Sequence, residues 1–277
     1  MAAGAVWLAL AMAPAAHASD ISFLLQFKNL SWTQVGNGND LSFNGGFYSA
    51  DLETNVANPY ITASLTYPGP GSPANLPQIS PTDYGFQTGL YSTQAAMDAD
   101  FPFGVYTYKG DNGDSAGYDY TADDYANSTP FLTGSDYSNL QGMNASLPFT
   151  FHFNPDDPGT MATESYVFFT IFDRTTSTLA YDDGFLPAST TSVTVPGGTL
   201  TPGDMYSFEL DYSNRDILRG LGTSDFPPEL GFDLRDDGTF TAAPLLASPE
   251  PATAGLIGLG LVAAALLGRR FNRKPTR

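Results

Sequence analysis

The sequence predicts an all-β protein, most simply a β-sandwich, and three observations support this prediction. Apolar and polar residues alternate with a period of two in short segments, most clearly in Leu147–Phe153 and Tyr206–Tyr212. Aspartate accounts for 24 of the 29 acidic residues, and Asp favours turns because its side chain bonds to nearby backbone. The 28 glycines and 21 prolines supply further turn residues between short strands.

Nine segments are expected to form strands because each is apolar or alternating and is bounded by Gly, Pro, Asn or Asp. They are Ile21–Phe27, Phe47–Leu52, Tyr60–Tyr67, Val105–Tyr108, Leu147–Phe153, Tyr166–Phe172, Thr191–Val195, Tyr206–Tyr212 and Gly231–Leu234. Val167–Phe172 is apolar nearly throughout, which predicts a central strand covered on both faces. Thr93–Asp98 has helical composition.

Turns and loops are expected between these strands. Pro68–Pro81, which holds five prolines, and Gly110–Gly142, which is rich in Gly, Asp, Ser, Asn and Tyr, are predicted to be long excursions. Asp182-Asp183-Gly184 and Asp237-Gly238 are predicted to be tight turns.

Two local motifs resemble those of known sandwich folds. Leu200, Pro202 and Tyr206 have a spacing similar to the tyrosine corner of immunoglobulin-like and fibronectin-type-III-like domains. In those domains the Tyr hydroxyl bonds to the backbone of the connecting turn. Phe101–Tyr106 resembles the Phe-Pro-x-Gly-x-Tyr strand entry of bacterial exported sandwich domains. The expected body is therefore a sandwich of the immunoglobulin/fibronectin-III-like type, or a jelly-roll-like one.

Residues 1–18 are expected to be a signal peptide. Ala5–Ala13 is apolar, and Ala16-His17-Ala18 before Ser19 fits a small-x-small cleavage site. A transmembrane anchor is the alternative, but the stretch is short and Pro14 interrupts it. No Lys or Arg precedes the apolar stretch, which leaves open a true start upstream of Met1.

Residues 249–277 form a three-part tail: Pro249-Glu250-Pro251, an uncharged apolar run at 252–268, and a basic end at 269–277. The 17 apolar residues would reach about 25 Å as a helix, near the lower limit for one transmembrane helix. The basic end favours a cytoplasmic C-terminus and would set the topology through its positive residues. These are Arg269, Arg270, Arg273, Lys274 and Arg277.

The order and spacing of the three parts resemble the PEP-CTERM tail. The resemblance implies a protein of a Gram-negative-type bacterium that makes exopolysaccharide, routed to the cell envelope and then outside. It also implies an exosortase-type membrane protease as partner, with Pro249-Glu250-Pro251 as the sorting motif that it recognises. A plain membrane anchor that no enzyme processes is the alternative.

The exported body is expected to be one sandwich domain at 19–241, or two smaller ones, followed by a spacer at 242–248. Between Ser19 and Ser248 there are six basic and 28 acidic residues, a formal charge of −22, which excludes nucleic-acid binding. The chain has no cysteine, so its core must hold without disulfides.

The composition argues against an enzyme. His152 is the one histidine of the mature body and is expected on the exposed face of its strand. The chain has no Gly-x-Ser-x-Gly elbow, no Walker loop, no thiol and too few histidines for zinc chemistry. We therefore expect a non-enzymatic surface or matrix component, with exopolysaccharide as a candidate partner. The alternative is a carbohydrate-binding or carbohydrate-active protein, since glycosidases need only two carboxylates.

Two groups of loop residues are candidates for binding. Hard oxygen ligands suit calcium, and the densest cluster consists of Asp111, Asp114, Asp119, Asp123 and Asp124. Solvated Asp-rich turns are the simpler interpretation, and no other cofactor is implied. Aromatic residues in and near the long loop are candidates for glycan or matrix contact: Tyr106, Tyr108, Tyr118, Tyr120, Tyr125 and Tyr137.

Overall fold

The alternating segments form strands, as the sequence predicts, in a computed structural model that describes residues 19–218 and 228–244. All nine expected segments lie in or overlap strands. The described strands are β1 Ile21–Gln34, β2 Leu41–Thr54, β3 Ala63–Thr66, β4 Ala74–Leu76, β5 Gln78–Ser80, β6 Asp83–Gln87, β7 Gly104–Gly110, β8 Ser115–Tyr120, β9 Phe149–His152, β10 Glu164–Asp173, β11 Thr178–Asp182, β12 Leu186–Pro187, β13 Ser192–Val195, β14 Met205–Ile217 and β15 Glu229–Thr241.

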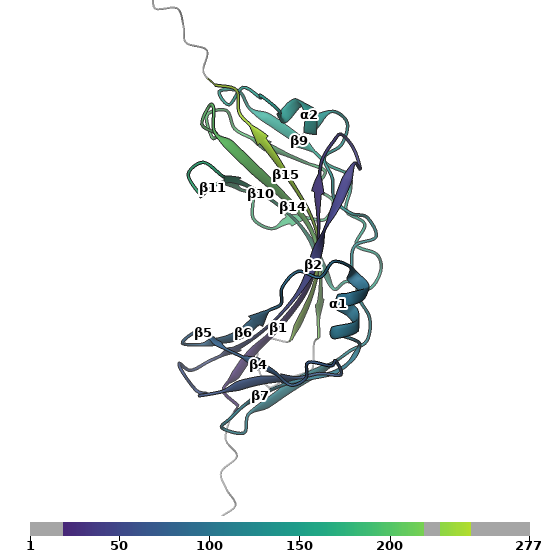
Figure 1. Cartoon of the computed structure of the whole chain (residues 1–277), viewed down its shortest axis with the longest axis vertical. Coiled ribbons are helices and arrows are strands. Elements are labelled where there is room, and N and C mark those ends of the chain that lie inside the picture. The colour runs from purple at the N-terminus through teal and green to yellow at the C-terminus, as the bar shows by residue number, and fades with distance from the viewer. Residues whose placement is uncertain (1–18, 219–227, 245–277) are drawn as a thin grey trace, which may run out of the picture.

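One large sheet of nine strands runs through the length of the molecule (Figure 1). Its order is β11-β10-β14-β15-β1-β2-β6-β5, with β12 also paired to β10. The first and last described strands lie side by side and parallel, from Leu25 opposite Glu229 to Thr33 opposite Asp237. The other pairings in this sheet are antiparallel.

Two small sheets pack against one face of the large sheet, at opposite ends of the long axis (Figure 1). At one end β9 pairs with β13, and the Phe151 ring of β9 lies 4.6 Å from Phe169 of β10 and 6.4 Å from Phe240 of β15. At the other end is the sheet β4-β3-β7-β8, in which Tyr108 donates a hydrogen bond to the Leu25 carbonyl of β1. The two layers bury an aromatic core between them.

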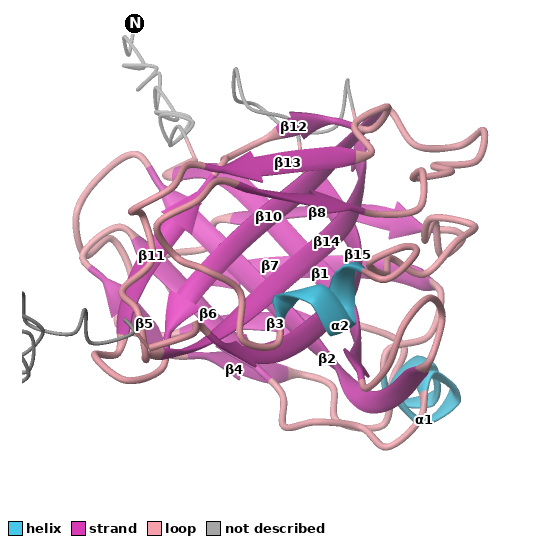
Figure 2. Cartoon of the chain, turned by 90° about the horizontal axis from the view of Figure 1, so that it is seen from above, coloured by secondary structure: helices cyan, strands magenta, loops and turns pink. Residues whose placement is uncertain are grey.

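The described helices are two short ones, α1 Gln94–Asp100 and α2 Asp136–Leu140, and α1 lies at the margin of the sheets (Figure 2). Helix α1 confirms the helix expected from the composition of Thr93–Asp98. Thr93 is its N-cap, and the Thr93 hydroxyl accepts a hydrogen bond from the Ala96 backbone N–H, which satisfies one otherwise free donor of the first turn.

The tyrosine corner forms as its spacing predicts. Tyr206 is 1% exposed. Its hydroxyl accepts a 2.7 Å hydrogen bond from the Thr201 N–H and donates a 3.3 Å hydrogen bond to the Thr201 carbonyl. The second motif behaves similarly, because the Tyr106 hydroxyl donates to the Pro102 carbonyl at 2.8 Å. Each hydroxyl thus ties a turn to the strand that follows it.

Replacing Tyr206 with phenylalanine is expected to destabilise the fold by about 1–2 kcal/mol, because the partly buried hydrogen bonds between its hydroxyl and the Thr201 backbone are lost. Urea unfolding of the variant would measure this change. Tyr181→Phe is the matched control, because the Tyr181 hydroxyl bonds to Asp183 in an exposed place. Equal stability of the two variants would show that the corner does not stabilise the fold.

Several segments that were expected to be loops or turns contain regular secondary structure. The excursion Gly110–Gly142 contains β8 and α2, and Pro68–Pro81 contains β4 and β5. Asp237-Gly238 lies inside β15 rather than at a hairpin turn, because it pairs with β14 on one side. Val167–Phe172 is not covered on both faces: Val167, Phe169 and Ile171 are buried, whereas Phe172 is 40% exposed.

The predicted signal peptide and the tail from Pro249 onward lie outside the described residues. Within residues 19–218 and 228–244, no helix is long and apolar enough to cross a membrane.

Candidate functional site

The face of the nine-stranded sheet opposite the two small sheets, here named the outer face, carries charged and aromatic side chains. Successive residues of a strand point to opposite faces. Phe208, Leu210 and Tyr212 of β14 therefore enter the core, while their neighbours point outward. The register aligns the outward positions of three adjacent strands: Tyr166, Phe168, Thr170 and Phe172 of β10; Ser207, Glu209, Asp211, Ser213 and Arg215 of β14; Glu229, Asp233, Arg235, Asp237 and Thr239 of β15.

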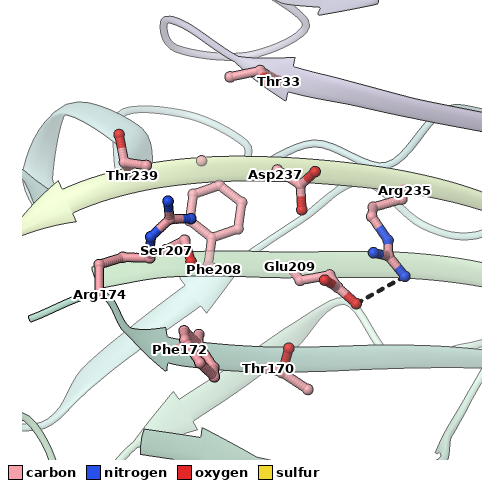
Figure 3. Close-up of a pocket in the computed structure, with 11 residues that line it drawn as sticks. Thr33, Thr170, Phe172, Arg174, Ser207, Phe208, Glu209, Arg235, Asp237 and Thr239 are labelled. Carbon is pink, nitrogen blue, oxygen red and sulfur yellow. Dashed lines mark ion pairs between the residues drawn. The ribbon is translucent and has the colours of Figure 1, made fainter. Parts of the chain in front are cut away.

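A groove of about 490 Å³ lies on the outer face. Figure 3 shows Arg174 and Phe172 on one side of it, with Glu209, Arg235 and Asp237 on β14 and β15. Hydroxyl groups complete its lining: Thr33, Thr170, Ser207 and Thr239. A second hollow of about 170 Å³ shares Thr170 and Glu209 with the groove, so the two adjoin on the outer face.

Arg235 holds two acidic side chains of β14. Its Nη2 atom lies 3.0 Å from Glu209 Oε1, and its Nε atom lies 3.0 Å from Asp211 Oδ1. Burial raises the pKa of Asp211 well above its usual range, even though Arg235 acts to lower it. The same two opposing effects give Asp237, which lines the groove, a raised pKa. The groove therefore combines carboxylates with a guanidinium that neutralises part of their charge.

Arg215 forms a second, looser cluster in the smaller hollow. Its Nε atom lies 3.6 Å from Glu229 Oε1, and its Nη2 atom lies 3.7 Å from Asp233 Oδ1. Its guanidinium carbon lies 4.1 Å from the centre of the Phe27 ring. A cation over an aromatic face is attracted by the ring quadrupole. Gly231 leaves room for this contact, because a Cβ atom there would lie 2.2 Å from the Phe27 ring.

An aromatic row lies beside this charged row. Tyr166 and Phe168 of β10 contact Phe185, with ring centroids 5.2 and 4.4 Å apart, and Phe185 is 68% exposed. Phe172 continues the row at the groove. Aromatic rings pack on the C–H faces of sugars while hydroxyl, carboxylate and guanidinium groups bind sugar hydroxyls. The outer face can therefore bind a polar, ring-containing ligand.

Two of the five predicted calcium ligands lie together at the β7–β8 turn, where both already bond to protein. Asp111 accepts hydrogen bonds from the Ile61 and Thr62 backbone N–H groups. Asp114 accepts from the Tyr60 hydroxyl at 2.8 Å and from the Asp20 N–H. Both carboxylates thus hold the turn against neighbouring chain.

The other three predicted ligands lie elsewhere. Asp119 is exposed within β8, and Asp123 bonds to Lys28. Burial raises the pKa of Asp124 to about 6, with a further contribution from Asp216. In residues 19–218 and 228–244, no three His, Cys, Asp or Glu residues are placed to hold a metal ion. Calcium binding at the cluster stays a prediction.

The expectation of glycan contact is wrong for four of the six tyrosines, which are core residues. Tyr106, Tyr108, Tyr118 and Tyr120 are at most 3% exposed, because β7 and β8 face the large sheet. Tyr125 and Tyr137 are half-buried and pack against the core. His152 is exposed, as expected, and its Nδ1 atom lies 2.9 Å from Asp136 Oδ2.

The outer face itself was not anticipated from the sequence. The sequence indicates one part of this face in Tyr206–Tyr212, where the polar residues Glu209 and Asp211 alternate with the core residues and so point away from the core. Only the pairing of β14 with β10 and β15 shows that these positions adjoin Phe172 and Arg235.

Comparison with known proteins identifies the C-terminal segment. A family model described as the PEP-CTERM protein-sorting motif matches residues 249–274. The chain carries a PEP-CTERM sorting motif. The match includes Pro249-Glu250-Pro251, the apolar run and the first four basic residues of the tail, which confirms the resemblance seen in the sequence. The motif implies export through a membrane-anchored sorting intermediate and processing by an exosortase, a membrane protein.

Solved structures give only remote similarities. A "Biofilm associated protein - BSP domain" is 14% identical over 79% of this chain and 29% of its own, with a TM-score of 0.21. A trypsin-activated alpha-2-macroglobulin from Escherichia coli is 10% identical over 77% of this chain and 15% of its own (TM-score 0.25). A tetra-tandem repeat in the extending region of a large adhesion protein is 15% identical over 78% and 50% (TM-score 0.23).

TM-scores this low do not establish a common fold, and the chain spans at most half the length of these three structures. No curated protein matches the chain.

Proposed function

We propose that this chain is a non-enzymatic surface or extracellular-matrix protein, delivered by its sorting motif and released from the membrane by an exosortase. The match at residues 249–274 carries the proposal, because it implies export and processing. The strongly acidic, cysteine-free body would then work outside the cell. The tyrosine corner at Tyr206 supports a sandwich of the immunoglobulin/fibronectin-III-like type for this body.

We further propose that the body binds polysaccharide along the outer face. The groove beside Phe172 and Arg174 supports this proposal, because it combines an exposed ring with hydroxyl and charged groups. The smaller hollow adjoins the groove, and two adjoining hollows suit a chain of sugars better than a single small molecule. The acidic surface would favour a neutral or basic glycan over an anionic one.

The charge arrangement supports binding without hydrolysis. A glycosidase needs one carboxyl group free to donate a proton and another free to act as a base or nucleophile. Arg235 engages both Glu209 in the groove and Asp211 in the smaller hollow, and Asp237 in the groove accepts a hydrogen bond from the Ser31 hydroxyl at 3.2 Å.

The double variant Phe172→Ala/Arg174→Ala is expected to weaken binding of the host's purified exopolysaccharide about tenfold or more, or about 1.4 kcal/mol. It removes an exposed ring and an exposed charge from the groove. Isothermal titration calorimetry would measure the change.

The matched control is Ile61→Ala/Lys109→Ala, which removes one exposed apolar and one exposed basic side chain near β3 and β7. Equal affinities of the two double variants would place the polysaccharide site elsewhere. No detectable binding by the wild-type protein would contradict the polysaccharide proposal while leaving the sorting proposal intact.

A further inference from the structure

Lys28 is a buried lysine in the middle of the core face of β1. Its side chain is 1% exposed, whereas lysine is almost never fully buried unless it is paired. The Nζ atom lies 2.7 Å from Asp98 Oδ1 of α1 and 3.1 Å from Asp123 Oδ1, just after β8. One amine and two carboxyl groups, from three separate parts of the chain, thus meet within hydrogen-bond distance.

The surroundings of this cluster are aromatic. The Nζ atom lies 5.0 Å from the centre of the Tyr120 ring and 5.9 Å from that of Phe103. The Tyr120 hydroxyl donates a hydrogen bond to Asp123 Oδ1. Lys28 and Asp123 therefore face each other beside aromatic rings and away from most of the solvent.

We propose that Lys28 and Asp123 form an intramolecular isopeptide bond, with Asp98 as the proton carrier. One proton passes from the Lys28 ammonium through Asp98 to Asp123, which leaves a neutral amine and a neutral carboxylic acid. The amine nitrogen attacks Asp123 Cγ, and a C–N bond forms. The attacking nitrogen then loses a second proton, which Asp98 delivers to the departing hydroxyl, and the C–O bond breaks to release water. No other reactant is required.

The two aspartates differ in ways that assign their roles. The Asp123 side chain is 17% exposed and the Asp98 side chain 32%, so Asp123 is the better shielded from water. Burial raises the pKa of Asp123 despite the opposing effect of Lys28, which favours the protonated form that can be attacked. Tyr120 donates to the Asp123 oxygen on which negative charge develops after attack. Asp98, closer to Nζ and more exposed, is placed to accept and return protons.

The bond would join β1 covalently to the segment after β8 and close a loop that contains β2 to β8. The chain has no cysteine, so no disulfide can make such a link. Cross-links that close long loops stabilise a fold by restricting the unfolded chain. This inference is independent of the proposed sorting and polysaccharide binding.

Intact-mass spectrometry of the full chain, expressed in its host and isolated in its processed form, tests the proposal. The expected mass is one water molecule below that calculated from its own termini, and peptide mapping should recover a Lys28–Asp123 cross-linked peptide. A mass without this loss would overturn the proposal. A cross-link from Lys28 to Asp98 would overturn the assignment of the two carboxyl groups.

Asp98→Asn provides the second test, because it keeps the size of the side chain but cannot carry the proton. Its circular dichroism spectrum should match that of the wild type, while its mass should lack the loss of water. The matched control is Asp100→Asn on the same helix, which should retain the cross-link; Asp100 accepts a hydrogen bond from Tyr91 instead. Water loss in Asp98→Asn equal to that of the wild type would contradict the role given to Asp98.

Discussion

Replacing Asp236 with asparagine is expected to stabilise the folded chain at neutral pH and to remove much of its loss of stability between about pH 4 and pH 8. Asp236 points from β15 into the core and is 0% exposed. Burial raises its pKa from 3.8 to about 8, and the neighbouring Asp237 contributes further.

The direction of the pH effect follows from proton binding. Between pH 4 and pH 8 the folded state keeps a proton on Asp236 that the unfolded state has lost. Stability therefore falls as pH rises through this range and is highest below the unfolded pKa. At about 1.4 kcal/mol for each unit between the two pKa values, the cost is about 2–5 kcal/mol near neutrality. Asparagine has no carboxyl group to ionise and avoids this cost.

Urea unfolding of wild type and variant at a series of pH values would measure this effect. Asp119→Asn is the matched control, because Asp119 is exposed on β8; it should leave the pH dependence close to that of the wild type. A variant as steeply pH-dependent as the wild type would show that Asp236 does not titrate in the core.

Replacing Phe151 with alanine is expected to destabilise the fold by about 3–5 kcal/mol. Phe151 is 0% exposed, and its ring connects the small sheet β9–β13 with the large sheet. Its ring centroid lies 4.6 Å from that of Phe169 and 6.4 Å from those of Phe208 and Phe240. Removal of the ring would leave a cavity beside β10, β14 and β15. These strands cannot move to fill it without breaking the hydrogen bonds of the sheet.

Thermal and urea unfolding would measure the loss for Phe151→Ala. Phe172→Ala removes the same atoms from the outer face, where the ring is 40% exposed, and should cost much less. Similar losses for the two variants would contradict the view that this buried aromatic contact stabilises the packing of the small sheet on the large one.

Local sequence pattern was enough to predict nine of the 15 described strands and the tyrosine corner, which depends on a few neighbouring residues. The alternation in Tyr206–Tyr212 gave the correct core face of β14, and Leu200, Pro202 and Tyr206 gave the corner. These features depend on short-range geometry, which a period of two or a fixed spacing encodes directly.

The outer face and the Lys28 cluster depend on long-range pairing, which no local pattern encodes. Glu209 and Arg235 approach each other only because β14 and β15 pair in one register, across the 219–227 segment. Lys28 meets Asp98 and Asp123 from positions 70 and 95 residues away. The same reason explains why the sequence places Tyr118 and Tyr120 in an exposed loop. Ser115–Tyr120 has a polar composition, and only its pairing with β7 shows that it is a strand whose tyrosines are buried.

The intact mass of the mature protein, from host cells with and without the exosortase, tests the central claim most directly. The sorting proposal predicts that the wild-type species ends near Pro249–Pro251, while the protein from cells lacking the exosortase keeps residues 252–277. A protein that keeps these residues in both strains would contradict it and would identify the tail as a membrane anchor that the exosortase does not process.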